Sequence, residues 1–447
     1  FIINMIIFTM MSNFFETITA PATPLSYGGI GVIRISGDKA LDIIKLFFNR
    51  EIKENSINHG WIIENNEKID EVIVLYFKAP KSYTGEDVIE IQTHGSPVVI
   101  KRILNLILNS GARLADRGEF TKRAFLNHKM DLTEAEAVLE LINSKTSKSA
   151  SKNASNLSGA LYKKISDMKD KIVEILAKIT ASIDFPEDVK EVSYDEIINA
   201  LEFVKIEIEN ILKNAKSHNI LREGINIAVI GRPNVGKSSL FNKLLNLERA
   251  IVTDIAGTTR DIIKESFEIE GIFATLTDTA GIRENEDIDK VEQIGINQAK
   301  NSIKDSDIVL LLFDGTKGIT KEDEEIFNLA KDKKTILVAT KADINDTNYQ
   351  NAISISSKTG FNIDKLKSLI YQNVININVD DTEFTTNQRQ QEKLSDALQF
   401  INNALIASKN NELQDLISID IKSALISLGE ISGEVINDEI LNGIFEK

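Results

Sequence analysis

The segment Gly231-Arg-Pro-Asn-Val-Gly236-Lys237-Ser238 decides the fold of the central part of this chain of 447 residues. It fits the pattern G-x-x-x-x-G-K-[ST], follows the apolar run 226–230 directly, and leads into a helical pattern at Leu240. A strand before the motif and a helix after it are the context that a phosphate-binding loop requires. Its glycines let backbone N–H groups close around phosphates at a helix N-terminus, which already favours anions. The sequence therefore predicts a P-loop nucleotide site.

Each part of this loop has an expected role on a bound nucleotide. Lys237 is expected to reach the β- and γ-phosphates, and the Ser238 hydroxyl is expected to bind Mg²⁺. The alternative, a chance glycine turn before a helix, is disfavoured because both flanking conditions are met. The expected nucleotide contacts of the loop are Asn234, Val235, Gly236, Lys237, Ser238 and Ser239.

Three further motifs identify the base as guanine. Asp278-Thr279-Ala280-Gly281 ends an apolar run and supplies the Asp-x-x-Gly of a γ-phosphate switch. Thr340-Lys341-Ala342-Asp343 follows the run 336–339, where GTPases place [NT]-Lys-x-Asp, and Thr340 departs from the commoner Asn. A carboxylate at Asp343 can accept hydrogen bonds from guanine N1 and N2, whereas adenine offers no such pair of donors. Ser356-Ser357-Lys358 stands where a Ser-Ala-Lys-like loop would pack on the base.

Two absences bear on the mechanism of hydrolysis. Ile282 follows Gly281, so the glutamine that often orients the attacking water is missing, and no arginine finger can be identified from the sequence. Transition-state charge still requires a counter-ion. Asn234 could give a side-chain oxygen to a monovalent cation beside the phosphates, or it could stabilise the loop. The sequence leaves these two alternatives open.

The composition predicts a globular protein of several domains. Hydrophobic residues make up 42% of the chain, and 67 Asp and Glu against 52 Lys and Arg give a formal net charge of −15. So acidic a chain is no general polyanion binder, and any nucleic-acid site must be a local basic patch. Without cysteine the chain can form no disulfide, thiolate zinc site or cysteine nucleophile, and with four histidines a histidine-rich metal centre is not expected.

The pattern of residue types changes three times along the chain. Residues 14–130 mix short β-like runs with helix, and residues 131–218 contain almost no Gly or Pro and carry apolar residues at helical spacing. Strands and helices then alternate over 225–370, as in a parallel sheet covered on both faces, before long helices return after 385. This predicts one helical domain interrupted by an inserted α/β domain. The expected strands are 30–35, 72–77, 88–92, 226–230, 308–313 and 336–339, and the expected helices are 97–109, 394–407 and 413–428.

No membrane segment is expected. The first ten residues are apolar, but they lack the basic flank and the small-residue cleavage site of a signal peptide. No other run approaches the roughly 20 apolar residues that a membrane helix needs. The prediction is a cytoplasmic protein, and whether residues 1–10 belong to it stays open.

Several longer stretches resemble a known family. The segment Ile255-Ala-Gly-Thr-Thr-Arg-Asp261 looks like the switch of the translation-factor-related GTPases. Other matching stretches, spread between about residues 15 and 445, are Gly28-Gly-Ile-Gly-Val-Ile-Arg34-Ile-Ser-Gly37, Tyr83-Thr-Gly-Glu-Asp87, Gly118-Glu-Phe-Thr-Lys-Arg-Ala-Phe-Leu-Asn127 and Leu221-Arg-Glu-Gly224. With these motifs the chain resembles the tRNA-modification GTPase MnmE (TrmE) family.

The resemblance implies an architecture and an activity. It implies an N-terminal α/β domain (12–130) that binds a tetrahydrofolate derivative and dimerises, a helical domain in two parts (131–220 and 381–447), and a Ras-like P-loop GTPase domain (221–380) inserted between them. The implied enzyme is a K⁺- and Mg²⁺-dependent GTP hydrolase, a homodimer that acts with the FAD-dependent MnmG (GidA) partner in a heterotetramer or larger complex. With 5-formyl- or methylene-tetrahydrofolate, the two proteins would place a carboxymethylaminomethyl-type group on C5 of the wobble uridine of certain tRNAs. Which tRNAs, which one-carbon unit and how hydrolysis is coupled stay open.

The resemblance also implies roles for individual residues. Thr259 would bind Mg²⁺ with Ser238 and complete the catalytic set with Lys237. Glu292, in Val291-Glu-Gln-Ile-Gly295, would orient the attacking water, and the alternative for it is a solvated helix charge. The K⁺ ligands would be Asn234, Thr253, the Ile255 carbonyl and Thr258, and Asp254, Ala256 and Gly257 would also contact the nucleotide.

Folate contacts transfer to Arg34, Glu90 and Lys129. A carboxylate can hold a pterin amide and amine, while cations suit the glutamate tail. Without the resemblance, Glu90 would be interpreted as a solvent-facing charge on an alternating strand and Lys129 as a surface lysine. The C-terminus departs from the family pattern, because the family ends in Phe-Cys-Ile-Gly-Lys and this chain stops at Ile444-Phe-Glu-Lys447. We expect the sequence to be incomplete, the alternative being a form that hydrolyses GTP and modifies tRNA poorly.

Two basic stretches are candidates for a tRNA-facing surface. Residues 101–130 hold seven Lys and Arg against Asp116 and Glu119, and residues 143–164 hold five Lys and no acid. The alternative is a solvated basic face. Two rival functions are a ribosome-assembly GTPase and a non-catalytic folate-binding scaffold with a G-domain switch. The eight acidic and two basic residues of 410–447 argue against the first, and the intact nucleotide motifs argue against the second.

Overall fold

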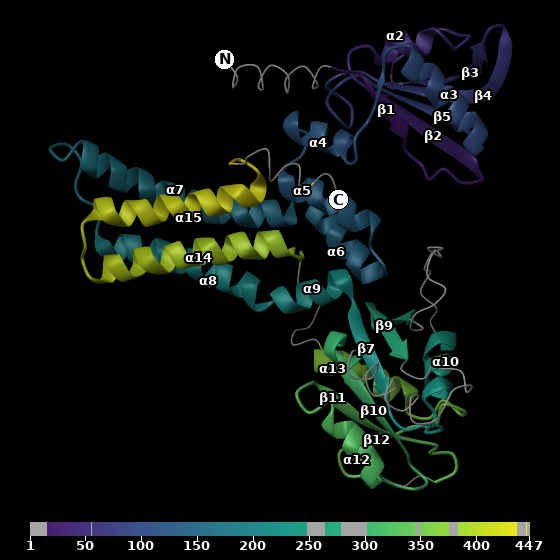
Figure 1. Cartoon of the computed structure of the whole chain (residues 1–447). Helices are drawn as coiled ribbons and strands as arrows, with labels where there is room; N and C mark the ends of the chain where they lie inside the picture. Colours follow the sequence, from purple (N-terminus) through teal and green to yellow (C-terminus); the bar gives the residue numbers. More distant parts are fainter. Residues whose placement is uncertain are drawn as a thin grey trace, which may run out of the picture. The chain divides into compact units, whose positions relative to one another are not determined.

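A computed structural model describes residues 16–54, 56–247, 264–278, 302–345, 349–374, 383–435 and 444 (Figure 1). The chain divides into two units. The N-terminal unit comprises Phe1–Glu136 with Gly433–Lys447, and the second unit comprises Ala137–Ser432. Within the described ranges, no helix is both long enough and apolar enough to cross a membrane.

The N-terminal unit contains a six-stranded sheet in the order β3-β4-β5-β2-β1-β6. Neighbouring strands run antiparallel except β1 and β6, which are parallel. Because side chains alternate between the faces of a strand, Ile33 and Ile35 of β2 point into the core while Arg34 points to the other face. The strands are β1 Ile18–Pro21, β2 Gly28–Ser36, β3 Ile57–Glu64, β4 Glu67–Phe77, β5 Val88–Gly95 and β6 Arg113–Leu114.

Helices cover the apolar face of this sheet. Ile100, Ile103 and Ile107 of α3 share a core with the buried isoleucines of β2 and β5. Helix α3 spans the predicted range, because Ser96 is extended with Pro97 at the first helical position, and Gly111 follows the end with a φ of 101°. Helices α2 Ala40–Lys45 and α3 Pro97–Asn109 contribute to this core. The unit also contains α4 Glu119–Leu126, and the division between the two units falls within α5 Leu132–Ile142.

Long antiparallel helices form one part of the second unit. Buried apolar residues recur along α7 at helical spacing, from Leu161 through Ile172 to Ile179, and they share a core with Leu394 and Ile421. Helices from residues before and after the second sheet therefore lie side by side, α7 with α15 and α8 with α14 (Figure 1). The helices are α6 Ser147–Leu157, α7 Ala160–Asp184, α8 Tyr194–Lys213, α9 Ala215–Glu223, α14 Gln388–Lys409 and α15 Gln414–Ser432.

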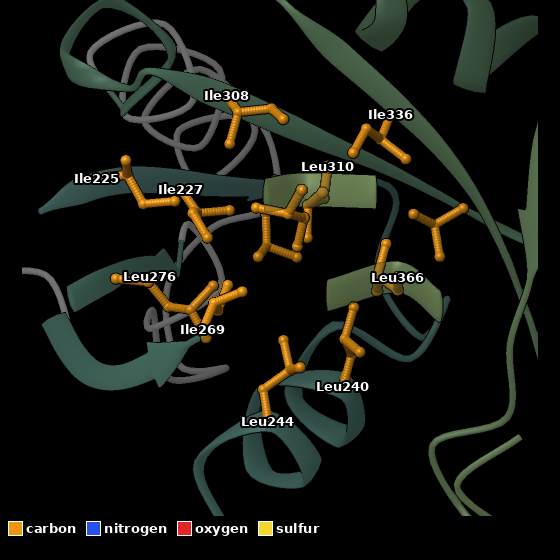
Figure 2. Close-up of a cluster of buried hydrophobic side chains, with 14 of the residues drawn as sticks. Ile225, Ile227, Leu240, Leu244, Ile269, Leu276, Ile308, Leu310, Ile336 and Leu366 are labelled. Atoms are coloured by element: carbon orange, nitrogen blue, oxygen red, sulfur yellow. The ribbon is translucent and has the colours of Figure 1, made fainter. Parts of the chain in front are cut away.

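The second sheet has the strand order β12-β11-β10-β7-β9-β8. All neighbours are parallel except β8 and β9. Every residue of β10 is buried, as expected for a strand covered on both faces. Figure 2 shows Ile227 of β7, Leu310 of β10 and Leu240 of α10 turned toward one shared core. The elements are β7 Ile225–Ile230, α10 Lys237–Leu247, β8 Lys264–Ile269, β9 Ile272–Asp278, β10 Ile308–Asp314, α12 Lys321–Asn328, β11 Thr335–Thr340, β12 Ala352–Ser354 and α13 Ile363–Val374.

Each predicted strand and helix is present, although several begin or end some residues away from the predicted bounds. The sequence does not predict β3, whose alternation is interrupted by Gly60. A Cβ on Gly60 would lie 2.7 Å from the Phe48 ring, so packing between distant segments selects glycine there. This packing is a property of the folded unit and leaves no local signal for a strand.

Candidate functional site

The phosphate loop follows β7 and enters α10 with the backbone geometry that its glycines predict. A Cβ on Gly231 would lie 2.4 Å from the Leu312 carbonyl oxygen of β10, so only glycine fits where the loop leaves the sheet. Asn234 and Gly236 have φ values of 63° and 102°, in the left-handed region that most side chains avoid. These turns bend residues 231–236 back over the N-terminus of α10.

Lys237 and Ser238 occupy the first turn of α10, where unpaired backbone N–H groups favour an anion. The Lys237 side chain is buried, and its Nζ donates to the carbonyl oxygens of Gly231 (2.7 Å) and Arg232 (2.8 Å). A positive charge is thus held at the centre of the loop. The geometry is that of an anion site with one fixed cation.

The base-recognition segment is tied directly to the phosphate loop. Thr340 is the last residue of β11. Its hydroxyl lies 2.5 Å from the carbonyl oxygen of Val235 and 3.1 Å from the carbonyl oxygen of Phe313, and it donates one shared hydrogen bond to these two acceptors. Val235 lies within the phosphate loop, so the departure from Asn at position 340 still places a donor between the two loops. The sequence could not show this contact, because it joins residues 105 positions apart.

Lys341 follows in the left-handed region, with a φ of 63°, and its Nζ donates to Asp314 at 2.7 Å. Burial alone would raise the pKa of Asp314. Hydrogen bonds from Lys341 and Thr316 lower this pKa by a larger amount, and the net result is a pKa of about 2. Asp314 is therefore ionised at neutral pH and holds Lys341 at the sheet edge. In the sequence, the only signal for Asp314 is its position at the end of an apolar run.

Asp343 and Ser356 meet at the same edge of the sheet. The Ser356 hydroxyl donates to Oδ1 of Asp343 at 2.7 Å, and it accepts from the backbone N–H of Thr359 at 3.2 Å. No described residue donates to Oδ2 of Asp343, which leaves an acceptor for a ligand. Ser357 and Lys358 lie in the turn between Ser356 and Thr359, and the first residue of this predicted base loop, Ser356, contacts Asp343.

Part of the predicted nucleotide site lies outside the described residues. The predicted site residues concerned are Thr253, Asp254, Ile255, Ala256, Gly257, Thr258, Thr259, Thr279, Ala280, Gly281 and Glu292. Asp278 is the last residue of β9 and pairs in register with Val229 of β7. It therefore reaches the same sheet edge as the phosphate loop.

In the N-terminal unit, Arg34 and Glu90 form a pair across neighbouring strands. They are register partners on β2 and β5, and Nε and Nη2 of Arg34 both donate to Oε1 of Glu90, at 2.9 and 2.6 Å. The guanidinium lies over two aromatic rings, 5.1 Å from the centre of Tyr83 and 5.5 Å from that of Phe120. No described residue donates to Oε2 of Glu90. The pair is half-buried and keeps one open acceptor.

Lys129 lies against the loop that carries Tyr83. Its Nζ donates to the Pro80 carbonyl oxygen at 3.0 Å, and its side chain closely approaches Gly85. The structure therefore brings one loop into contact with both Lys129 and Arg34. Tyr83 and Phe120 lie within two of the motifs that resemble the family, but the sequence indicates no role for either ring, because cation–π stacking depends on tertiary contacts.

The predicted basic surface over residues 101–130 is wrong for Arg123, one of its seven cations. Arg123 is only 2% exposed, and it donates to Glu86 at 3.1 Å and to Glu119 at 2.9 Å. Arg102 pairs with Glu64 and Glu67, and Arg113 pairs with Glu16 and Glu119. Over 143–164, the Lys145 ammonium lies 4.2 Å from the Phe273 ring, and Lys164 pairs with Glu207. Acidic residues thus neutralise four cations of the two stretches, namely Arg102, Arg113, Arg123 and Lys164.

Two family models and several known proteins match this chain. The family model described as MnmE helical domain matches residues 132–447, and that described as GTP-binding protein TrmE N-terminus matches residues 17–129. The tRNA modification GTPase MnmE of Acetivibrio thermocellus is 40% identical over 97% of this chain and 98% of its own. The protein of the same name from Alkaliphilus metalliredigens is 41% identical over 96% of this chain and 98% of its own. Among solved structures, Aquifex aeolicus Era bound to GDP·AlF₄⁻ is 27% identical, covering 39% of this chain and 66% of its own with a TM-score of 0.28.

The parallel sheet with its phosphate loop and base loop defines the class of protein as a P-loop GTPase. The two matching family models together account for almost the whole chain. The chain belongs to the MnmE family of tRNA modification GTPases, and it is a GTP hydrolase.

Proposed function

We propose that this GTPase requires K⁺ and, with an FAD-dependent partner of the MnmG type, modifies C5 of the wobble uridine of certain tRNAs. One observation carries the nucleotide part: Lys237, Thr340 and Asp343 converge at one sheet edge, with the Thr340 hydroxyl joining the base segment to the phosphate loop. Family membership supports the tRNA chemistry. The GTP contacts are those that the motifs predict, with Lys237 on the phosphates and Asp343 on guanine.

Mg²⁺ and K⁺ would occupy neighbouring positions at the phosphate loop. Ser238, in the first turn of α10, would bind Mg²⁺ together with Thr259. The side chain of Asn234 is exposed and makes no hydrogen bond to any described residue, which weighs against a loop-stabilising role. Its oxygen would therefore serve K⁺, beside ligands from Thr253, Ile255 and Thr258. Such a cation would supply the charge that an arginine finger provides elsewhere, and Glu292 would orient water.

A tetrahydrofolate derivative, 5-formyl or methylene, would bind at the Arg34–Glu90 pair. The open Oε2 of Glu90 can accept from the amide and amine of a pterin, while Arg34 holds the carboxylate in place through Oε1. Lys129, exposed on the adjoining loop, suits the anionic tail of the ligand. The Tyr83 and Phe120 rings would keep the guanidinium in one orientation.

The architecture would be a dimer with a GTPase domain inserted into a helical one. The shared core of Leu161 and Ile172 with Leu394 and Ile421 supports the insertion, with boundaries near 131, 221 and 381. Leu25, Tyr27 and Ile30 of the N-terminal unit are 59, 87 and 67% exposed, which supports burial of that surface in a homodimer. The complex with the partner and tRNA would be cytoplasmic.

Reconstitution tests the proposed function. The full-length protein, the FAD-dependent partner, unmodified tRNA, methylene-tetrahydrofolate as the one-carbon donor, glycine as the amine and GTP are combined in KCl, and the tRNA nucleosides are analysed by mass spectrometry. We expect a new C5-substituted uridine that requires both proteins and GTP. Lys237→Ala should abolish it, because the phosphates lose their fixed cation. Hydrolysis without any change in tRNA, together with binding to ribosomal subunits, would favour a ribosome-assembly function instead.

A further inference from the structure

The second residue of the phosphate loop, Arg232, is anchored to a different element. Its Nε donates to Oδ1 of Asp323 at 2.7 Å, and its Nη1 donates to Glu322 at 3.1 Å. Both carboxylates lie in the first turn of α12, the helix that follows β10. A loop residue and a helix 90 positions away are thereby joined by charged hydrogen bonds.

Asp323 is a rigid anchor. Its side chain is completely buried, and its second oxygen accepts from the backbone N–H of Thr320 at 3.0 Å and from the Thr320 hydroxyl at 2.8 Å. These bonds form a capping box, which fixes the start of α12. Each oxygen of Asp323 therefore has its own partners, and the one facing Arg232 is held in place.

The main chain of Arg232 contacts the lysine of the phosphate-loop motif, Lys237. Its carbonyl oxygen accepts from Lys237 at 2.8 Å, next to the Gly231 carbonyl at 2.7 Å. On the opposite side, Thr340 holds the Val235 carbonyl. A loop that binds phosphates through backbone N–H groups depends on exact backbone positions.

We propose that Arg232 is a positioning residue for phosphate binding, held by Asp323, and that it sets the backbone of the phosphate loop. This inference rests on the proposed nucleotide site. The guanidinium is directed to the two carboxylates of α12, so it does not serve as an arginine finger for its own active site. The role acts on the phosphates of the nucleotide and not on the base, which Asp343 and Ser356 would hold at the other end of the site.

The two ends of the nucleotide provide the test. Affinities of the full chain for GDP and for guanosine, which has no phosphate, are measured by competition with a fluorescent GDP. Asp323→Asn keeps an oxygen for Thr320 but removes the charge that holds Arg232. Loss of a charged hydrogen bond should weaken GDP binding about tenfold and leave guanosine binding within about twofold. Arg232→Met should have the same effect, and the double variant should be no weaker than the weaker single one, because both disrupt one contact.

Two further variants serve as controls. Glu324→Gln changes an exposed carboxylate in the same turn of α12 that makes no hydrogen bond to Arg232, and its GDP affinity should stay within about twofold of the wild type. Arg232→Lys keeps the charge but cannot donate to both carboxylates in the same geometry, so it should restore GDP binding only in part.

Several results would overturn the inference. Equal losses of GDP and guanosine affinity would mean that the ion pair only stabilises the fold, and unchanged GDP affinity would mean that it does nothing for the loop. In single-turnover hydrolysis, Arg232→Met should reduce the rate less than about tenfold, whereas a fall on the order of 10³-fold would identify a finger. A wild-type chain that fails to bind fluorescent GDP would refute the proposed nucleotide site itself.

Discussion

Substitution of Arg123 by Met should strongly destabilise the N-terminal unit. Methionine keeps the apolar length of the side chain but removes the charge, which is 2% exposed in the wild type. Glu119 would retain Arg113, which donates to it at 2.7 and 3.0 Å, whereas Glu86 would keep only the Ser36 hydroxyl at 2.7 Å. Breaking a buried ion pair costs about 3–5 kcal/mol, and one uncompensated carboxylate that is 18% exposed places this case near about 3 kcal/mol.

The single tryptophan allows this effect to be measured in the unit where it arises. Trp61 lies on β3 of the N-terminal sheet, so its fluorescence during heating follows that unit and not the GTPase sheet. A loss of about 3 kcal/mol should lower its Tm by roughly 10 °C. Arg117→Met, at an exposed arginine, is the matched control and should change the free energy of unfolding by less than about 0.5 kcal/mol. Equal melting temperatures for the two variants would refute the buried ion pair.

The stability of the Arg123→Met variant should fall less on acidification than the stability of the wild type. Burial alone would raise the pKa of the Glu119 carboxyl. Hydrogen bonds from Arg113, the Asp116 backbone and Arg123 lower this pKa by a larger amount, so it lies below its ordinary value of 4.5. Because the folded pKa is depressed, its contribution to stability is present above about pH 4.5 and is lost as the pH falls through the folded pKa. The Tm difference between wild type and Arg123→Met should therefore narrow below pH 4.5. A difference that widens on acidification would contradict this assignment.

Three further predictions concern the ligands. Asp343→Asn should weaken GTP binding about 100-fold or more, through loss of two charged hydrogen bonds, and should improve xanthosine triphosphate binding; unchanged selectivity in competition assays would place the base elsewhere. If K⁺ acts as an arginine finger does, the wild type should hydrolyse GTP faster in KCl than in NaCl by a factor on the order of 10³. Asn234→Ala should remove most of this difference, and equal wild-type rates in both salts would exclude a K⁺ site. Glu90→Gln should weaken tetrahydrofolate binding about tenfold or more by calorimetry, with Glu71→Gln, on the neighbouring strand, expected to have no effect.

Local chemistry determined much of this protein from its sequence alone. The order of glycine, lysine and serine between an apolar run and a helical pattern predicts the phosphate loop, and the loop has the left-handed residues and the buried lysine that this prediction requires. Apart from the exposed Asn226, the strands 226–230, 308–313 and 336–339 are apolar because both of their faces are covered. Such features are readable because the residues that cause them are neighbours in the chain.

The tertiary structure alone decided which charged and polar side chains meet. Arg123 has the appearance of a surface cation in the sequence, but Glu86, 37 positions away, neutralises it in the interior. Arg34 meets Glu90 through the register of two strands, and Arg232 meets Asp323 through the packing of α12 beside the phosphate loop. Hydrophobic periodicity predicts that elements form, but an ion pair across 37 to 91 positions depends on how complete elements pack and align. No local pattern carries that information, because the partner of each charge is selected only when the fold closes.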